Sequence, residues 1–159
     1  MVKKLQKKQL DFRIALIAAQ WHKDLVAVAK NSCYKELSEL GVDVDNNIEQ
    51  FTVPGSLEIP LISKLIAQSG NFDAVIAFGF VVDGGIYRHE FVAQAVLNGM
   101  MSVALETKIP ILSVVLTPQK FDEHNAEHIT FFRKHLGIKG VEAARSAMQT
   151  MQMVRLLQK

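Results

Sequence analysis

The segment from Asp73 to Val81, DAVIAFGFV, constrains the fold more than any other part of the sequence, because it is almost continuously apolar. A short apolar run of this kind predicts a strand that is covered on both faces, as strands of parallel sheets are. Three further β-rich runs, 12–18, 47–53 and 109–116, predict strands as well. Helical patterns separate and follow them, at about 24–40, 56–70, 86–106, 119–135 and 141–157. This alternation predicts an α/β fold, a three-layer α/β/α sandwich around a four-stranded parallel sheet.

The predicted alternation of strands and helices also indicates where a ligand would bind. In doubly wound, flavodoxin-like sheets, ligands bind beyond the carboxyl ends of the strands. Four segments reach that edge here, namely AAQWH, TVPGSLE, FGFVVDGGIYRH and SVVLTP. Each carries a polar or aromatic group, so candidate site residues are sought in these segments.

Composition narrows the class of protein. We expect the 159 residues to form one domain, 1–159, with residues 1–10 as a flexible, solvated tail that contains the basic cluster KKLQKK. A net charge of +2 is too small for a nucleic-acid surface, and no apolar run is long enough for a membrane span. The single cysteine, Cys33, excludes an internal disulfide and fits a reducing, cytoplasmic compartment.

The segment VVDGGIYRH places two glycines and then two basic residues where a strand passes into a helix. Gly84 and Gly85 allow close approach of a ligand, and a helix N-terminus favours an anion, most often phosphate. Arg88 and His89 are otherwise poorly placed near the positive end of a helix dipole, and a bound phosphate would neutralise them. The alternative is a tight turn with two solvated cations. The segment matches neither a Walker motif nor the dinucleotide fingerprint, which argues against a nucleotide cofactor.

Other candidates have an ordinary structural explanation beside the functional one. Trp21 is the only tryptophan and either stacks on a heteroaromatic ring or packs in a core or interface. Glu58 either binds a ligand or caps a helix, and Ser56 is expected as the N-cap. The histidines at 124, 128 and 135 lack a zinc motif, so we expect no metal. Phe131 and Phe132 need burial, for which a neighbouring subunit is one source.

Four stretches together resemble one known family. VPGSLEIP is similar to the VPG-A-[FY]-EIP signature of lumazine synthases, and GFVVDGGIYRHEFV resembles the second signature of that family. IPILSVVLT and KGVEAARSAM resemble its last strand and last helix. The DGGIYRH variant is similar to the second type of the family, which is associated with decamers. The resemblance covers nearly the whole chain.

The resemblance implies an activity and an assembly. Lumazine synthases condense 5-amino-6-(ribitylamino)uracil with 3,4-dihydroxy-2-butanone 4-phosphate to give 6,7-dimethyl-8-ribityllumazine, phosphate and water, in riboflavin biosynthesis. They need no cofactor and are built from pentamers, with the active site between subunits. Riboflavin or FMN is a further ligand that the resemblance suggests.

The resemblance also assigns residues to the site. Trp21, Ser56, Leu57, Glu58, Phe80, Val81, Val82 and Ser113 match the pyrimidine and ribityl site, with Ser113 in place of a usual aromatic residue. Gly85 and Ile86 match the phosphate turn, and His128, Arg133, His135 and Lys139 are candidates for the basic groups near the phosphate.

One departure affects the catalytic group. The catalytic histidine of the family falls on Arg88, and His89 follows one residue later. Arginine stays protonated and is a poor proton shuttle, whereas histidine is suited to proton transfer. Arg88 and His89 therefore both stand as catalytic candidates, with Arg88 for phosphate and His89 for the proton as the division to test. A flavin- or lumazine-binding protein without efficient turnover is the alternative function.

Overall fold

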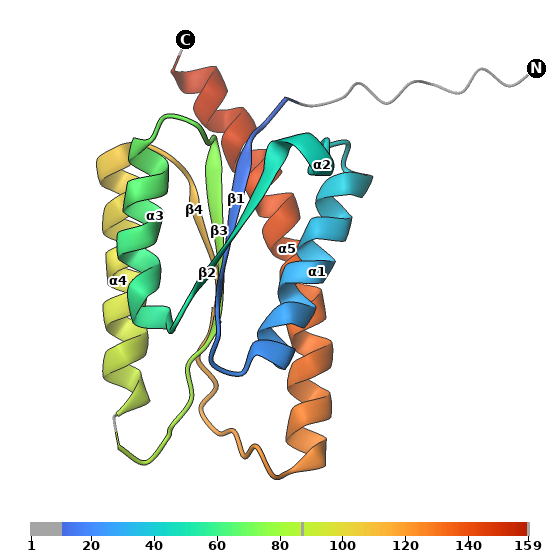
Figure 1. The fold of residues 1–159 in the computed structure, drawn as a ribbon, viewed down its shortest axis with the longest axis vertical. Coiled ribbons are helices and arrows are strands. Elements are labelled where there is room, and N and C mark those ends of the chain that lie inside the picture. The colour runs from blue at the N-terminus through green and yellow to red at the C-terminus, as the bar shows by residue number, and fades with distance from the viewer. Residues whose placement is uncertain (1–10, 87, 159) are drawn as a thin grey trace, which may run out of the picture.

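The structure, a computed structural model, describes residues 11–86 and 88–158. Residues 1–10, expected as a flexible tail, lie outside the described residues, as do Tyr87 and Lys159. The strands β1 (Ile14–Ala19), β2 (Ile48–Val53), β3 (Ala74–Phe80) and β4 (Ile111–Leu116) form one sheet in the order β2-β1-β3-β4 (Figure 1). Every pair of neighbouring strands is parallel, so the predicted four-stranded parallel sheet is confirmed.

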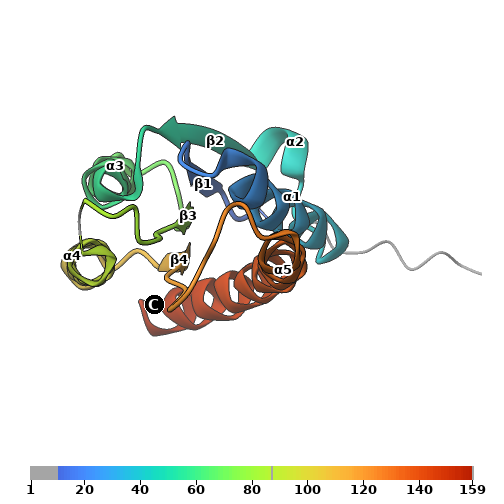
Figure 2. The same ribbon diagram turned by 90° about the horizontal axis from the view of Figure 1, so that it is seen from below.

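Helices cover both faces of the sheet, which confirms the three-layer prediction. Figure 2 shows α1 (Lys23–Glu39) and α5 (Ala126–Leu157) on one side, and α3 (Ile59–Gln68) and α4 (His89–Thr107) on the other. The short helix α2 (Val44–Asn47) was not expected from the sequence, and the 3₁₀ turn η1 (Ser56–Glu58) forms the first part of the helix expected over 56–70.

The two central strands explain why their sequences are so apolar. All residues of β1 and β3 are buried. Successive side chains of a strand point to opposite faces, so Leu16 and Phe78 pack toward α1 and α5, while Ile17 and Val75 pack toward α3 and α4. A central strand with helices on both sides needs apolar residues at every position, which is what DAVIAFGFV supplies.

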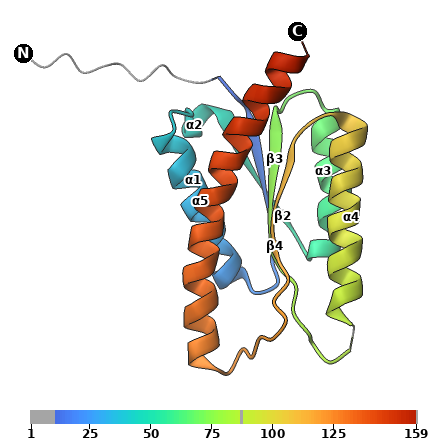
Figure 3. The ribbon, with the colours of Figure 1, turned by 180° about the vertical axis from the view of Figure 1, so that it is seen from behind.

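The prediction of two helices over 119–135 and 141–157 is wrong. A single helix, α5, runs without a break from Ala126 to Leu157 along the length of the molecule (Figure 3). The expected break contains Gly140, where an added Cβ would lie 2.1 Å from the carbonyl oxygen of Ala29. This glycine therefore serves close packing of α5 on α1 rather than a turn. Lys139, expected beside a helix start, lies within α5.

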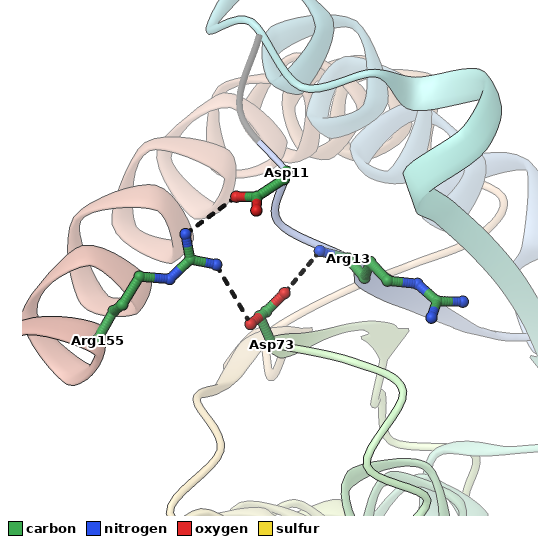
Figure 4. A network of polar contacts seen from close by, with 4 residues as sticks. All are labelled: Asp11, Arg13, Asp73 and Arg155. Carbon is green, nitrogen blue, oxygen red and sulfur yellow. Dashed lines mark hydrogen bonds and ion pairs between the residues drawn. The ribbon is translucent and has the colours of Figure 1, made fainter. Parts of the chain in front are cut away.

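At the amino-terminal edge of the sheet, one arginine joins both ends of the described chain (Figure 4). Arg155 of α5 contacts the Asp11 carboxylate at 3.0 Å and the Asp73 carboxylate at 3.6 Å, and its guanidinium lies 4.0 Å from the Phe12 ring centroid. The backbone N–H of Arg13 donates to Asp73 at 2.8 Å. The hydrogen bond and the charge of Arg155 hold the pKa of Asp11 below its ordinary value of 3.8.

We predict that Arg155→Met lowers the thermal midpoint at pH 7 and that the difference from wild type shrinks as the pH falls below about 4. The folded-state pKa of Asp11 is lowered, so its contribution to stability is present above the unfolded pKa and lost as pH falls through the folded value. Thermal denaturation followed by circular dichroism between pH 3 and 7 measures both effects.

Lys35→Met is the matched control, because it removes one cation from the exposed Lys35–Glu39 contact at 3.8 Å. Such a pair contributes only about 0–1 kcal/mol, so its midpoint should stay near that of wild type. A midpoint of Arg155→Met equal to that of the control at pH 7 would show that the contacts of Arg155 do not stabilise the fold.

Candidate active site

The parallel register brings the carboxyl ends of all four strands to one edge of the molecule. Ala19, the last residue of β1, pairs with Val53, the last of β2, and Phe80 of β3 pairs with Leu116 of β4. Figure 2 looks onto this edge from below. The segments that follow these four residues are therefore neighbours in space, although more than twenty-five positions separate each from the next along the chain.

Trp21 lies beside the turn that follows β2. An added Cβ on Gly55 would lie 3.5 Å from Cδ1 of the indole and 3.2 Å from a carboxylate oxygen of Glu58. The indole is 71% exposed, so Trp21 is not a core residue. The open ring face is free to stack on a planar ligand.

The cap of the Ser56–Glu58 turn differs from the prediction. Ser56 is not the N-cap. Instead the backbone N–H of Gly55 donates to the Glu58 carboxylate at 2.8 Å. Ser56 packs against β3, where a Cβ on Gly79 would lie 2.6 Å from the serine hydroxyl oxygen. Both explanations of Glu58 stay open, because a carboxylate has two oxygens and the capping bond uses one.

The two side chains at the end of β3 lie on opposite faces of the sheet. Phe80 is buried on the side of α1 and α5, and Val81 is buried on the side of α3 and α4. The N–H of Val81 donates to the carbonyl of Leu116 at 2.9 Å, toward β4. Because peptide directions alternate along a strand, the peptide groups of Phe80 point the other way, toward the end of β1.

The loop after β3 forms an open depression of about 610 Å³, lined by Asp83, Gly85, Ile86, Arg88, Glu90 and Phe91. Gly85 has φ +77°, in the left-handed region that favours glycine, and its N–H donates to the Asp83 carboxylate at 2.9 Å. Arg88 is exposed, and its guanidinium lies 5.8 Å from the Phe91 ring. The loop thus places one guanidinium and two carboxylates around the depression.

Arg88 and His89 take different positions. Arg88 immediately precedes α4 and lines the depression, whereas the side chain of His89, the first residue of α4, is only 12% exposed. The Nδ1 atom of His89 is buried, has no hydrogen-bond partner among residues 11–86 and 88–158, and lies 3.7 Å from the Glu90 carboxylate. The structure therefore brings Arg88, and not His89, to the candidate phosphate site within this chain.

The remaining candidates lie away from this depression. Ser113 pairs with Ala77, three residues before Phe80, so it lies about 10 Å back from the end of the sheet. On α5, Arg133 and Lys139 lie about 10 and 20 Å from the first residue of the helix, counting 1.5 Å per residue. His135 stacks on Phe131 with centroids 5.9 Å apart, and Lys139 pairs with Glu142 at 2.7 Å. Figure 2 shows α5 on the opposite side of the sheet from α4.

Comparison with known proteins assigns the family. A sequence model described as 6,7-dimethyl-8-ribityllumazine synthase matches residues 11–155. The chain belongs to the lumazine synthase family. It is 47% identical over 145 residues to 6,7-dimethyl-8-ribityllumazine synthase of Rhodococcus erythropolis, covering 91% of this chain and 92% of that one. The resemblance inferred from the sequence is confirmed.

Two further relatives carry the number 2 in their names. The chain is 45% identical to 6,7-dimethyl-8-ribityllumazine synthase 2 of Bradyrhizobium diazoefficiens, over 87% of this chain and 82% of that one. It is 44% identical to the protein of the same name from Pseudomonas syringae, over 92% of this chain and 85% of that one.

Two negative observations apply to the residues that the structure describes. No group of three or more His, Cys, Asp or Glu side chains is placed to hold a metal ion in this member of the lumazine synthase family. No helix within residues 11–86 and 88–158 is long and apolar enough to cross a membrane.

An aromatic cluster that the sequence did not predict lies beside the candidate site of this lumazine synthase family member. The rings of His22, Phe80, Phe121 and Phe132 make edge-to-face contacts, with centroids between 4.9 and 5.6 Å apart. His22 precedes α1 in the left-handed region, at φ +51°. The cluster supplies burial for Phe132 within one chain, while Phe131 stays 62% exposed. The only sequence signal was the density of aromatic residues near 121–132.

We predict that Gly79→Ala lowers the free energy of unfolding by about 1–3 kcal/mol, the usual cost of overpacking a buried position. The added methyl group would lie 2.6 Å from the Ser56 hydroxyl and would displace the turn against which it packs. Chemical denaturation measures the change.

Gly84→Ala is the control for this substitution, since a Cβ there has no atom within 4 Å among the described residues. Equal stabilities of the two variants would show that Ser56 is not held against β3.

Proposed function

We propose that this chain is the enzyme that condenses 5-amino-6-(ribitylamino)uracil with 3,4-dihydroxy-2-butanone 4-phosphate, forming 6,7-dimethyl-8-ribityllumazine, phosphate and water. Family membership supports the reaction. The observation that carries the site assignment is that three segments begin at one edge of the sheet: the segment with the exposed Trp21, the turn capped by Glu58, and the glycine turn that precedes Arg88. The reaction consists of imine formation, phosphate elimination and ring closure, and proton transfers suffice for these steps.

The ring substrate would lie between Trp21 and the end of β3. The exposed indole supplies a stacking surface, and backbone groups of Phe80 to Val82 supply hydrogen bonds to the edge of the pyrimidine. The ribityl chain would then follow Ser56 and Leu57 toward Glu58, whose second carboxylate oxygen accepts hydroxyl protons. Each of these groups lies at the edge where doubly wound folds bind ligands.

The phosphate would bind in the depression at Gly85, Ile86 and Arg88. Here the charges of one chain are unfavourable, because Asp83 and Glu90 outnumber the single guanidinium. The Gly85 N–H is also engaged by Asp83. A phosphate dianion therefore needs further cations and displacement of the Asp83 carboxylate from that N–H.

A neighbouring copy of the chain is the source of those cations that we favour. Arg133 is exposed and forms no ion pair within the described residues, so it is available to a site on another copy. Large apolar side chains are also exposed on the two helices next to the depression, Leu61, Leu65, Leu97, Met101 and Leu105. Exposed apolar stripes of this size mark contact surfaces. We propose a homo-oligomer built from pentamers, as the family resemblance implies.

The test of activity is an absorbance assay for lumazine formation with both substrates and the purified protein. Formation of the lumazine at a rate proportional to enzyme concentration supports the proposal. Tight binding of riboflavin or FMN without turnover would instead establish the alternative, a flavin-binding protein.

Substitution of Arg88 and His89 tests the division of roles. We predict that Arg88→Ala raises the apparent KM for the phosphorylated substrate, because a charge-assisted hydrogen bond contributes about 1.5–3 kcal/mol. His89→Ala should lower kcat by roughly 100-fold if His89 reaches the substrate as general acid or base. Steady-state kinetics with each substrate varied in turn gives both parameters. The small exposure of the His89 side chain favours a different result, in which Arg88→Ala abolishes turnover and His89→Ala changes it little. That result would mean that the arginine occupies the catalytic position.

The assembly is tested by analytical ultracentrifugation. We predict a stable species of five or ten chains of 17.7 kDa. A fully active monomer would contradict a site completed by a neighbouring copy.

A further inference from the structure

The loop from 117 to 125, which joins β4 to α5, crosses the carboxyl edge of the sheet (Figure 2). Two consecutive residues in it contact the rest of the protein. The ring of Phe121 lies 4.9 Å from the ring of Phe80 in the aromatic cluster. The backbone N–H of the next residue, Asp122, donates to Nδ1 of His128 at 3.1 Å.

His128 is held in place for this contact. It lies in the first turn of α5, where its own N–H donates to the Asn125 side chain that caps the helix. Because Nδ1 accepts the hydrogen bond from Asp122, the ring proton of the neutral imidazole is on Nε2. The imidazole of His128 therefore connects the loop to the first turn of α5.

The loop contact reaches the proposed ring site through Phe80. The hydrogen bond from Val81 to Leu116 is the last contact of the β3–β4 ladder, and the loops after β3 and β4 separate from that point. Phe121 returns from the second loop to cover Phe80, the residue whose peptide groups face the end of β1. Release of Phe121 would therefore loosen the strand end that binds the pyrimidine.

We propose that His128 is a positioning residue for the ring substrate, acting through Asp122, Phe121 and Phe80, rather than a ligand of the phosphate. This inference rests on the proposed function for its kinetic consequence only. The contact between His128 and the loop is a property of the fold and is measured separately.

The experiment compares three variants of the full-length protein. His128→Leu removes the acceptor, and His128→Asn restores an acceptor oxygen at about the position of Nδ1. His124→Leu is the matched control, because the side chain of this loop histidine is 88% exposed and contacts the exposed Glu123 carboxylate at 3.7 Å, while its backbone N–H, which donates to Asp122, is kept in the variant. Thermal denaturation first verifies that all three variants are folded.

Two readouts are predicted. Hydrogen exchange at residues 119–125 should be faster in His128→Leu than in wild type and should be slowed again in His128→Asn. The KM for 5-amino-6-(ribitylamino)uracil should rise roughly 3- to 10-fold in His128→Leu, the scale of one lost hydrogen bond, and return toward the wild-type value in His128→Asn. The KM for the butanone phosphate and kcat should change by less than about twofold in His128→Leu, since one phosphate contact would be worth more than that. His124→Leu should match wild type.

Three results would overturn the proposal. Unchanged hydrogen exchange in His128→Leu would show that the ring does not hold the loop, whether or not the protein makes lumazine. A rise in KM confined to the butanone phosphate, without rescue by asparagine, would make His128 a phosphate ligand. Equal values of the KM for the ring substrate in His128→Leu and wild type would show that the loop contact does not reach the site. If the wild-type protein forms no lumazine, the proposed function fails and positioning of its ring substrate fails with it, while the exchange result still decides whether His128 holds the loop.

Discussion

The structure depends on the hydrogen-bonded ladder between parallel strands. A central strand that helices cover on both faces needs apolar side chains at every position, and all residues of β1 and β3 are buried. The same parallel register places the four carboxyl ends in one row. Core and site are therefore consequences of one arrangement, since the strands that form the core also bring the candidate site residues together.

Two glycines allow other elements to pack closely around the sheet. Gly140 lets α5 approach the backbone of α1, and Gly79 leaves room for Ser56 at the end of the sheet. The Glu36–Arg145 ion pair, at 2.7 Å, further joins α1 and α5. Burial, and secondarily the charge of Glu36, raises the pKa of the Cys33 thiol between these helices to about 12, so this cysteine is a core residue and not a nucleophile.

Periodicity and turn residues predicted the sheet and the edge with the candidate site, because a strand that is buried on both faces has a continuous apolar sequence. They did not predict the continuity of α5, since Gly137 and Gly140 resemble a helix break unless the contact with Ala29 is known. Likewise Ser56 matched an N-cap pattern, yet the carboxylate of Glu58 makes the bond. The contrast between the exposed Arg88 and the largely covered side chain of His89 depends on how α4 packs, which local sequence does not encode.

In the proposed function, the heteroaromatic substrate binds at the carboxyl edge of the sheet against Trp21. Because this is the only tryptophan in the chain, its fluorescence reports on that edge alone. A fluorescence titration of the wild-type protein with 5-amino-6-(ribitylamino)uracil tests this binding position most directly. We predict saturable quenching that depends on ligand concentration and is absent when inorganic phosphate alone is added. Substrate binding established by calorimetry with unchanged tryptophan fluorescence would contradict it.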